Sequence, residues 1–312
     1  MRFLSKDSIK SSLLMLLVTF FWGSAVVAQD EGMRYMGPLS FTAVRCLLAA
    51  AVLFALYFAG KGVRRLRKLP PVPRDEDRAK VKASIVGGCI CGSFLVVGLL
   101  LQQYGLLYTT VGKSAFIATL YVVFIPLVEL LFGHRPKLRL WLSVALSVLG
   151  LYFMCMTGSF SFGAGDLLTL GSAFIIGLYI IGLDRYVQRV DAFLFTAFQQ
   201  LVCGTVSLIA MFLFEGTTWN AIMNSWLPIL YAGVVSGVFA YALEVYAQRG
   251  LSPVLAAIFF TTEAIFAALA SYVVQGELFT PREAIGALLV FAAVVAARLP
   301  EWKRKPKTEQ QK

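Results

Sequence analysis

Long apolar stretches separated by short polar segments account for most of the chain. Ten of them stand out, at about 11–29, 38–60, 83–108, 114–132, 138–157, 166–184, 192–214, 226–248, 253–274 and 281–299. Most approach the roughly 20 residues that a helix needs to cross a hydrocarbon core of about 30 Å. Backbone groups in lipid must be satisfied internally, and the stretches lack the period-two alternation of membrane barrel strands. The pattern predicts ten transmembrane helices.

The apolar pattern also repeats along the chain. Segment 166–214 aligns without a gap on segment 12–60, with 12 of 49 positions identical, including Gly23/Gly177 and Asp30/Asp184. Further along the offset falls from 154 to 143 positions and pairs Phe116 with Phe259. Each copy contains five predicted spans, and an odd number turns the second copy upside down in the membrane. The predicted fold is an all-α membrane protein with ten transmembrane helices in two inverted five-helix repeats.

This repeat divides the chain into four parts. Residues 1–82 are expected to hold helices 1 and 2 and a basic cytoplasmic loop, and residues 83–157 helices 3 to 5. Residues 158–300 form the second repeat, and residues 301–312 a basic cytoplasmic tail. The first apolar stretch resembles a secretory signal. Its internal counterpart at 166–184 favours a retained first helix instead.

Composition and charge support a membrane protein. Hydrophobic residues make up 59% of the chain and charged residues 14%, whereas soluble domains are about half apolar and a quarter charged. With the N-terminus in the cytoplasm, 24 Lys and Arg residues fall on the cytoplasmic side and three on the other. This bias predicts that both termini are cytoplasmic. The net charge of +11 therefore indicates membrane topology rather than nucleic-acid binding, and the loop Lys61–Lys82 is expected to be a solvated linker near anionic lipid.

Catalytic and metal-binding chemistry is poorly represented in the sequence. The five cysteines lie in predicted spans, and His134 is the single histidine. These residues make neither a metal-ligand set nor a nucleophile–base–acid set. The chain also lacks the G-x-x-x-x-G-K-[ST] nucleotide-binding motif. We expect no enzyme activity and no cofactor, and any transport must use a gradient, exchange or facilitated diffusion.

Several short motifs, in order, resemble the EamA branch of the drug/metabolite transporter superfamily. They are Phe21-Trp22-Gly23-Ser24, Pro38–Ala50, Gly105–Thr110, Ala115–Ala118, Ile125-Pro126, Gly250–Ala257, Glu263 and Gly276-Glu277. The resemblance extends from about Ser11 to Leu299. It implies ten helices in two inverted halves, a bacterial inner-membrane location, and a metabolite or amino-acid exporter lined by helices 1, 3, 4, 6, 8 and 9. Ala264 stands where members often have Pro, so the resemblance does not carry over a substrate.

Three of the charged side chains inside the predicted spans are candidates for a functional or structural role. Glu263 lies ten residues into its helix, about 15 Å deep, where a carboxylate costs several kcal/mol unless it is paired, hydrated or protonated. It could couple protons or bind a substrate amine, or it could be a protonated carboxyl that bonds a neighbouring helix. Glu244 has the same two interpretations. Arg45 stays charged and stands opposite Gln199 in the repeat, so we expect it to join helices as a structural charge.

Aromatic and amide side chains are the remaining candidates for the substrate site. Trp22, Tyr121 and Phe259 lie too deep for the aromatic belts at membrane surfaces and could line an apolar pocket. The other candidates are Gln102, Tyr108, Tyr179 and Tyr241. Core packing or helix–helix hydrogen bonding is the alternative for each. Pro126 is expected to kink helix 4 and to serve as the moving gate.

Together these features favour a secondary transporter. The hypothesis is export of a small organic metabolite, amino acids first, by alternating access, with proton coupling as one option. The alternatives are a passive, channel-like facilitator of small solutes and a membrane binding or scaffold protein that transports nothing. The expected partners are a small molecule, the lipid bilayer and protons, with no nucleic acid. The sequence specifies no oligomeric state.

Overall fold

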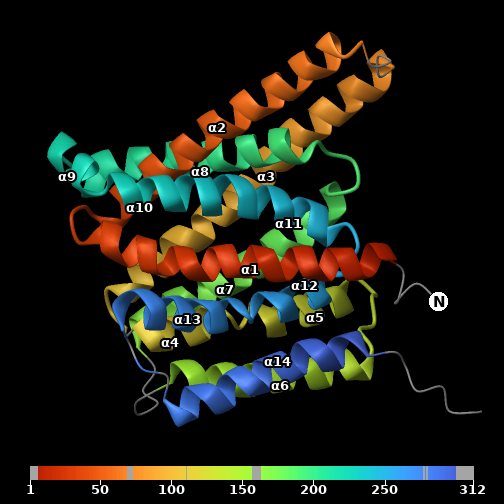
Figure 1. The fold of residues 1–312 in the computed structure, drawn as a ribbon. Coiled ribbons are helices and arrows are strands. Elements are labelled where there is room, and N and C mark those ends of the chain that lie inside the picture. The colour runs from red at the N-terminus through yellow and green to blue at the C-terminus, as the bar shows by residue number, and fades with distance from the viewer. Residues whose placement is uncertain are drawn as a thin grey trace, which may run out of the picture.

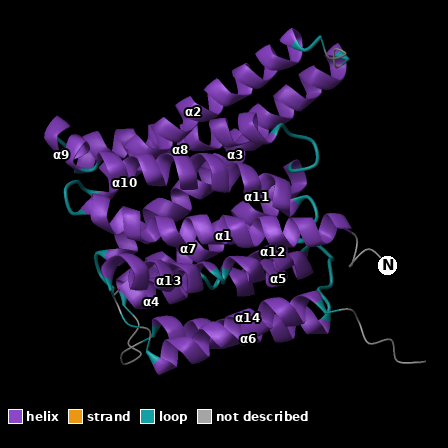
Figure 2. Ribbon diagram, in the orientation of Figure 1, coloured by secondary structure: helices purple, strands orange, loops and turns teal. Residues whose placement is uncertain are grey.

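The computed structural model describes residues 6–68, 73–109, 111–156, 163–276, 278 and 280–299, and these form helices and loops with no strand (Figures 1 and 2). In chain order the helices are α1 (Lys6–Met33), α2 (Pro38–Leu66), α3 (Arg74–Leu106), α4 (Val111–Ala118), α5 (Tyr121–Leu131), α6 (Leu138–Cys155), α7 (Ala164–Tyr186), α8 (Ala192–Phe214), α9 (Trp219–Asn224), α10 (Trp226–Leu230), the π-helix η1 (Tyr231–Ala240), α11 (Tyr241–Gln248), α12 (Pro253–Phe260), α13 (Glu263–Gln275) and α14 (Pro281–Arg298). The predicted tail 301–312 and Glu277 lie outside the described residues.

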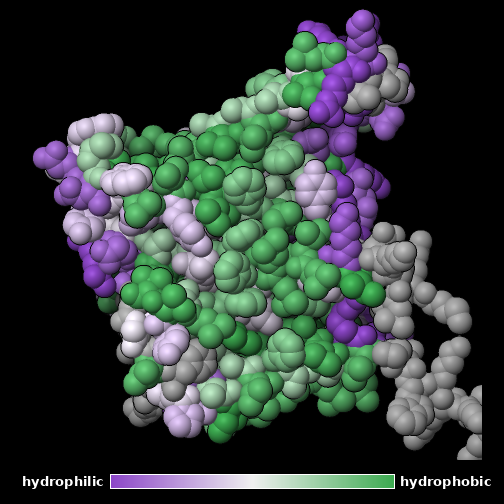
Figure 3. Space-filling model, viewed as in Figure 1, coloured by the Kyte–Doolittle hydropathy of each residue, from purple (hydrophilic) through white to green (hydrophobic). Residues whose placement is uncertain are grey.

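Nine segments of the described chain are long and apolar enough to cross a membrane, and they match the first nine predicted spans. The tenth predicted span is the helix α14, whose 18 residues include Arg282, Glu283 and Arg298. Figure 3 shows a broad hydrophobic surface between hydrophilic ends. The chain is therefore an all-helical integral membrane protein.

The basic segment between α2 and α3 differs from the prediction. The expected linker Lys61–Lys82 is largely helical, because α2 continues to Leu66 and α3 begins at Arg74. Arginine and lysine are good helix formers, and three acidic residues in the first turn of α3 suit its positive end. Lys61 Nζ lies 3.2 Å from Asp77 Oδ2 and joins the two helices. Figure 1 shows the end of α2 and the start of α3 projecting together beyond the main bundle.

Two of the spans are broken in the middle. The span 113–131 is interrupted between Ala118 and Tyr121, and the span 253–274 between Phe260 and Glu263. The sequence predicted a disturbance at Pro126, but Pro126 lies inside α5 and the interruption comes earlier in the chain.

Threonine hydroxyls satisfy the backbone at both breaks. Thr119 Oγ1 donates to the carbonyls of Ala115 at 2.8 Å and Phe116 at 2.9 Å. Thr262 Oγ1 donates to the carbonyl of Phe259 at 2.7 Å. Carbonyls freed inside a membrane need such partners, since lipid supplies none. A break of this kind can therefore persist in the middle of the bilayer.

A third irregularity is the π-helix η1, directly before α11. Its small residues let α2 approach closely: a Cβ added at Gly237 would lie 2.7 Å from Ala49 Cβ. π-Helical turns are rare and are frequent at functional sites. Here the irregular backbone ends one residue before Tyr241 and shortly before Glu244.

The remaining helices pack in pairs along their lengths. α2 lies along α8, α6 along α14, and α3 against both α7 and α8. α1 packs against α13, η1 and α11. The main hydrophobic core lies where α1, α5, α7, α11 and α12 meet, and includes Met15, Tyr179 and Phe259.

Polar contacts fasten one end of the bundle. Asp166 at the start of α7 accepts hydrogen bonds from Lys113 Nζ at 2.5 Å, Thr109 Oγ1 at 2.7 Å and the Gly163 amide at 2.7 Å. These bonds join the end of α3, α4 and α7. Glu215, after α8, accepts from the amides of Leu39 at 3.0 Å and Ser40 at 2.9 Å at the start of α2.

Replacing Glu215 should destabilise the protein. Glu215→Ala removes an anion and its hydrogen bonds from the positive end of α2, and loss of such a cap costs about 1–2 kcal/mol. The free energy of unfolding of the full chain in detergent, measured by titration with denaturing detergent, checks this. Glu31→Gln is the control, because the Glu31–Arg34 pair is exposed and such pairs contribute at most about 1 kcal/mol. Equal stabilities of wild type and Glu215→Ala would contradict the prediction.

The α6–α14 crossing should not tolerate a side chain. A Cβ added at Gly150 would lie 2.7 Å from the Gly286 carbonyl oxygen, so Gly150→Val forces the two helices apart at a cost of about 1–3 kcal/mol. The same unfolding titration measures the effect. The control is Gly60→Ala, where nothing lies within 4 Å and no loss of stability is expected. An unchanged unfolding midpoint for Gly150→Val would show that this crossing is not tightly packed.

Candidate functional site

A group of polar and aromatic side chains meets near the broken and π-helical segments. We call it the central cluster, and its members are Trp22 from α1, Tyr121 from α5, Tyr179 from α7, Gln199 from α8, Tyr241 and Glu244 from α11, and Phe260 from α12. Six helices thus contribute to one place in the bundle.

Glu244 is the buried acid of the central cluster. Its side chain is 0% exposed, and its Oε2 accepts a hydrogen bond from the Tyr179 hydroxyl at 2.8 Å. That hydroxyl in turn accepts from Gln199 Nε2 at 3.1 Å, so the phenolic proton is directed at Glu244. Glu244 Oε1 has no hydrogen-bond partner among the described residues. The protein thus holds one carboxyl oxygen by a hydrogen bond, and the other oxygen is available to a ligand.

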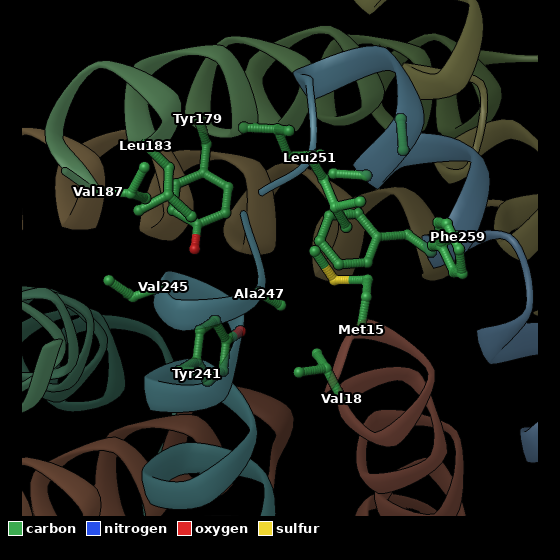
Figure 4. Packing of buried hydrophobic residues seen from close by; sticks show 14 of the residues in the cluster. Met15, Val18, Tyr179, Leu183, Val187, Tyr241, Val245, Ala247, Leu251 and Phe259 are labelled. Atoms are coloured by element: carbon green, nitrogen blue, oxygen red, sulfur yellow. The ribbon is translucent and has the colours of Figure 1, made fainter. Parts of the chain in front are cut away.

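A chain of aromatic rings leads from Tyr241, beside Glu244, to the helix breaks. The ring centroids of Trp22 and Tyr241 are 4.9 Å apart, and those of Trp22 and Phe260 are 5.3 Å apart. Phe260 then meets Tyr121 at 6.4 Å. The indole Nε1 of Trp22 is buried and has no partner in the described part of the chain. Figure 4 shows Tyr179 extending from α7 toward α11, where Tyr241 and Val245 lie.

Arg45 on α2 lies next to the central cluster. Its side chain is buried, and its charge acts on Tyr241 and on Cys46 and Cys203. The sequence predicted that its guanidinium would join helices through carboxylates or carbonyls. The structure shows no hydrogen bond or ion pair of this guanidinium with any described residue, and Nε is buried without a partner. The Gln199 amide, which stands opposite in the repeat, donates to Tyr179 instead.

Glu263 lies at the edge of the central cluster, at the first turn of α13. It is half-buried, lies near Tyr121, and makes no hydrogen bond or ion pair with the residues that the structure describes. The positive end of α13 offers it partial compensation. The break before it is held by a hydrogen bond between the hydroxyls of Thr19 and Thr262 at 2.9 Å, which ties α13 to α1.

The arrangement is costly for stability. An ion taken into a protein interior loses several kcal/mol of hydration, and only a close partner and further hydrogen bonds repay this. Arg45 and Glu244 lack such compensation. Buried intramembrane charges of this kind mark sites of binding or ion coupling more often than structural sites.

The other predicted site residues are placed as follows. Phe259 is buried in the apolar core, and Pro126 is buried within α5. Gln102 is half-buried on α3 and makes no hydrogen bond with the described residues. Tyr108 is 69% exposed beyond the end of α3, so the structure does not bring it to the central cluster. Its position follows from the helix ending at Leu106, which leaves Tyr108 outside the bundle.

Sequence reasoning missed three features of the site. The role of Phe260 was not foreseen, although its ring joins Trp22 to Tyr121. The Thr19–Thr262 contact was not foreseen, although two adjacent threonines within an apolar span could have indicated a break. The π-helix has no clear sequence signal apart from its glycines. No group of three or more metal-ligating side chains occurs among the described residues.

Comparison with known proteins gives the family. The profile of the EamA-like transporter family matches residues 9–156 and 163–299. An uncharacterized transporter of Archaeoglobus fulgidus is 27% identical over 93% of this chain and 86% of its own length. The uncharacterized inner membrane transporter YedA of Escherichia coli is 26% identical over 88% of this chain and 86% of its own length.

Two further similarities are more distant. The chloroplastic WAT1-related protein At3g02690 of Arabidopsis thaliana is 25% identical, over 90% of this chain and 68% of its own length. A solved crystal structure with 19% sequence identity superposes with a TM-score of 0.71, covering 92% of this chain and 96% of the other, which shows a shared fold. With its family profile matched in two segments that span almost the whole sequence, the chain belongs to the EamA-like transporter family.

Proposed function

We propose that this protein is a secondary transporter of small organic metabolites, with amino acids as the first candidates and export as the direction. The observation that carries the proposal is the buried Glu244 carboxyl, which Tyr179 holds through one oxygen while the other has no partner among the described residues. Membership of a transporter family supports transport in general. The substrate, the coupling and the mechanism belong to this proposal.

Two inverted repeats of five helices would give this transporter its architecture. The same turn occurs at both helix breaks: the Val122 amide donates to Thr119 O at 3.1 Å, and, 143 positions later, the Ile265 amide donates to Thr262 O at 3.0 Å. The sequence repeat makes α8 the counterpart of α2 and α14 that of α6, and each helix packs against its counterpart. Two halves related by a pseudo-two-fold axis would pack in this way. α14 would then be the tenth span.

Alternating access would use the broken helices as moving parts. Discontinuous helices near the bilayer midplane are typical of carriers with inverted repeats, and their free ends face substrates and ions. α4 and α5, with Pro126, would move on one side of the central cluster, and α12 and α13 on the other. The Lys113–Asp166 bond would hold one end closed in the conformation seen here.

The orientation follows from charge. The Lys and Arg residues gather on the side of both termini and of the α2–α3 connection, so this side is assigned to the cytoplasm. A bacterial inner membrane is the expected location. Substrate would then pass from the cytoplasmic side toward the face that carries Lys113 and Asp166.

Proton coupling would operate through two acids inside the bundle, the buried Glu244 and the half-buried Glu263. Glu244 and Glu263 lack a cationic partner among the described residues, and a carboxyl in such a place is more stable neutral than charged. Each could therefore take up a proton from one side and release it to the other as the site opens. Tyr179 supplies the hydrogen bond that holds Glu244 in place through this cycle.

Glu263→Gln should abolish the pH dependence of transport. Uptake of a labelled amino-acid panel into proteoliposomes, with and without an imposed pH gradient, measures this. We expect saturable uptake by wild type that responds to the gradient, and uptake by Glu263→Gln that does not, because an amide cannot exchange a proton. Glu244→Gln should lose at least about tenfold in uptake, since Glu244 also contacts substrate.

The controls and contrary outcomes are specific. Glu31→Gln, at an exposed position, should transport as wild type does. An unchanged flux and pH profile in Glu263→Gln would refute coupling at that residue. Uptake that never exceeds equilibrium and shows no counterflow overshoot would indicate a channel-like facilitator. No uptake by folded wild type would reject amino acids as substrates.

A further inference from the structure

Arg45 and Glu244 are a buried cation and a buried acid that do not pair with each other. The ion pairs among the described residues, with N–O distances up to 4.0 Å, involve other groups. Both side chains act electrostatically on the Tyr241 hydroxyl. A salt bridge between two such groups would lower their energy. The absence of an ion pair between Arg45 and Glu244 therefore needs an explanation.

No acceptor among the described residues bonds the Arg45 guanidinium. Its electrostatic neighbours are Cys46, Cys203 and Tyr241, which are neutral side chains in their ordinary forms. Arginine presents a planar fork of N–H donors that matches a carboxylate through two parallel hydrogen bonds. A carboxylate on a bound molecule would supply what the described residues do not.

The environment of Glu244 suits a positively charged hydrogen-bond donor. Oε2 is occupied by Tyr179, and Tyr179 is held in turn by Gln199, so this edge of the carboxyl is fixed by the protein. Oε1 is buried and without a partner among the described residues. An ammonium group, which has three donors and a positive charge, would satisfy it.

A small dipolar molecule between the two groups would satisfy both at once. Two charge-assisted hydrogen bonds of about 2.8 Å, added to the roughly 3 Å between the carboxylate and ammonium of an α-amino acid, span about 8–9 Å. The aromatic rings of Trp22, Phe260 and Tyr121 lie to one side and would contact an apolar side chain.

We propose that Arg45 binds the α-carboxylate, and Glu244 the α-ammonium, of a neutral amino acid with an apolar or aromatic side chain. This inference rests on the proposed transport of amino acids and names the recognition at that same site. It places α2 at the substrate, in addition to the helices that the family resemblance implied. It also makes Arg45 a binding residue and replaces the structural role predicted from sequence.

The test compares whole amino acids with analogues that lack one charge. L-Phenylalanine, 2-phenylethylamine and 3-phenylpropionate share a side chain, as do L-leucine, 3-methylbutylamine and 4-methylpentanoate. Binding to the full chain in detergent is followed by intrinsic tryptophan fluorescence, and transport by counterflow in proteoliposomes. We expect wild type to bind the better amino acid at least about tenfold more tightly than its amine or its acid, because each charged contact adds to affinity.

The variants separate the two contacts. Arg45→Met should lower amino-acid affinity to that of the amine and leave amine affinity unchanged. Glu244→Gln should lower it to that of the acid and leave acid affinity unchanged. If Arg45→Met weakens amine and amino acid equally, or neither, while wild type transports the amino acid, the recognition proposal is overturned and the proposed function stands. If wild type neither binds nor transports either amino acid, both are overturned.

Stability gives an independent test of the same assignment. An unsatisfied buried guanidinium costs energy, so Arg45→Met should unfold at the same temperature as wild type or higher. Arg249→Met is the matched control, because the Arg249 guanidinium donates to Val187 O at 2.8 Å and Val190 O at 3.0 Å, and its loss should lower the unfolding temperature. A fall in Arg45→Met equal to that in Arg249→Met, or failure to fold, would show that Arg45 joins helices and would overturn the proposal.

Discussion

The fold depends on one constraint: polar groups inside a bilayer must find partners within the protein. Most of the chain meets it with regular helices. Where the helices break, threonine hydroxyls donate further hydrogen bonds to backbone carbonyls, as at Thr119 and Thr262. Where two helices cross most closely, glycines bring the backbones into contact, as at Gly150 and Gly286. Some of the buried polar atoms that lack partners among the described residues lie around Glu244.

Around Glu244 the structure holds polar groups in position without satisfying them fully. The Gln199–Tyr179–Glu244 chain fixes one carboxyl oxygen, while Glu244 Oε1, Trp22 Nε1 and Arg45 Nε stay without partners among the described residues. A protein selected for stability alone would replace such groups with apolar ones. Their position beside a π-helix and two broken helices connects the unsatisfied chemistry to the parts of the backbone that can rearrange most easily.

The sequence predicted the helices well because length and hydropathy dominate in a membrane. Nine spans, the helix at 281–298 and the family were all accessible from the apolar pattern and short motifs. The extent of the basic linker could not be predicted from the apolar pattern. Residues 61–66 and 74–82 continue the helices α2 and α3, whereas the hydropathy pattern ends these helices at the membrane. The breaks at Thr119 and Thr262 were also missed, because proline was the expected signal and neither break contains one.

The candidate site was only partly predictable. Glu244, Tyr179, Tyr241 and Trp22 could be nominated because polar or aromatic residues deep in a span are unusual. Their mutual contacts depend on helix packing that one sequence does not specify. The proposed role of Arg45 rests on a hydrogen bond that the described structure lacks. The sequence alone predicts the reverse, because a charge inside a span is expected to have a partner. Tyr108 lies at the end of a predicted span and was named as a candidate for the substrate site. In the structure its side chain is exposed and lies away from the central cluster.

The most direct measurement is an experimental structure of the full chain with a transported amino acid bound. The account predicts ligand density between α2 and α11, with the carboxylate at the Arg45 guanidinium and the ammonium at Glu244 Oε1. The side chain should lie against Trp22 and Phe260. Density elsewhere in the bundle, with Arg45 hydrogen-bonded to protein groups in the occupied state, would contradict it.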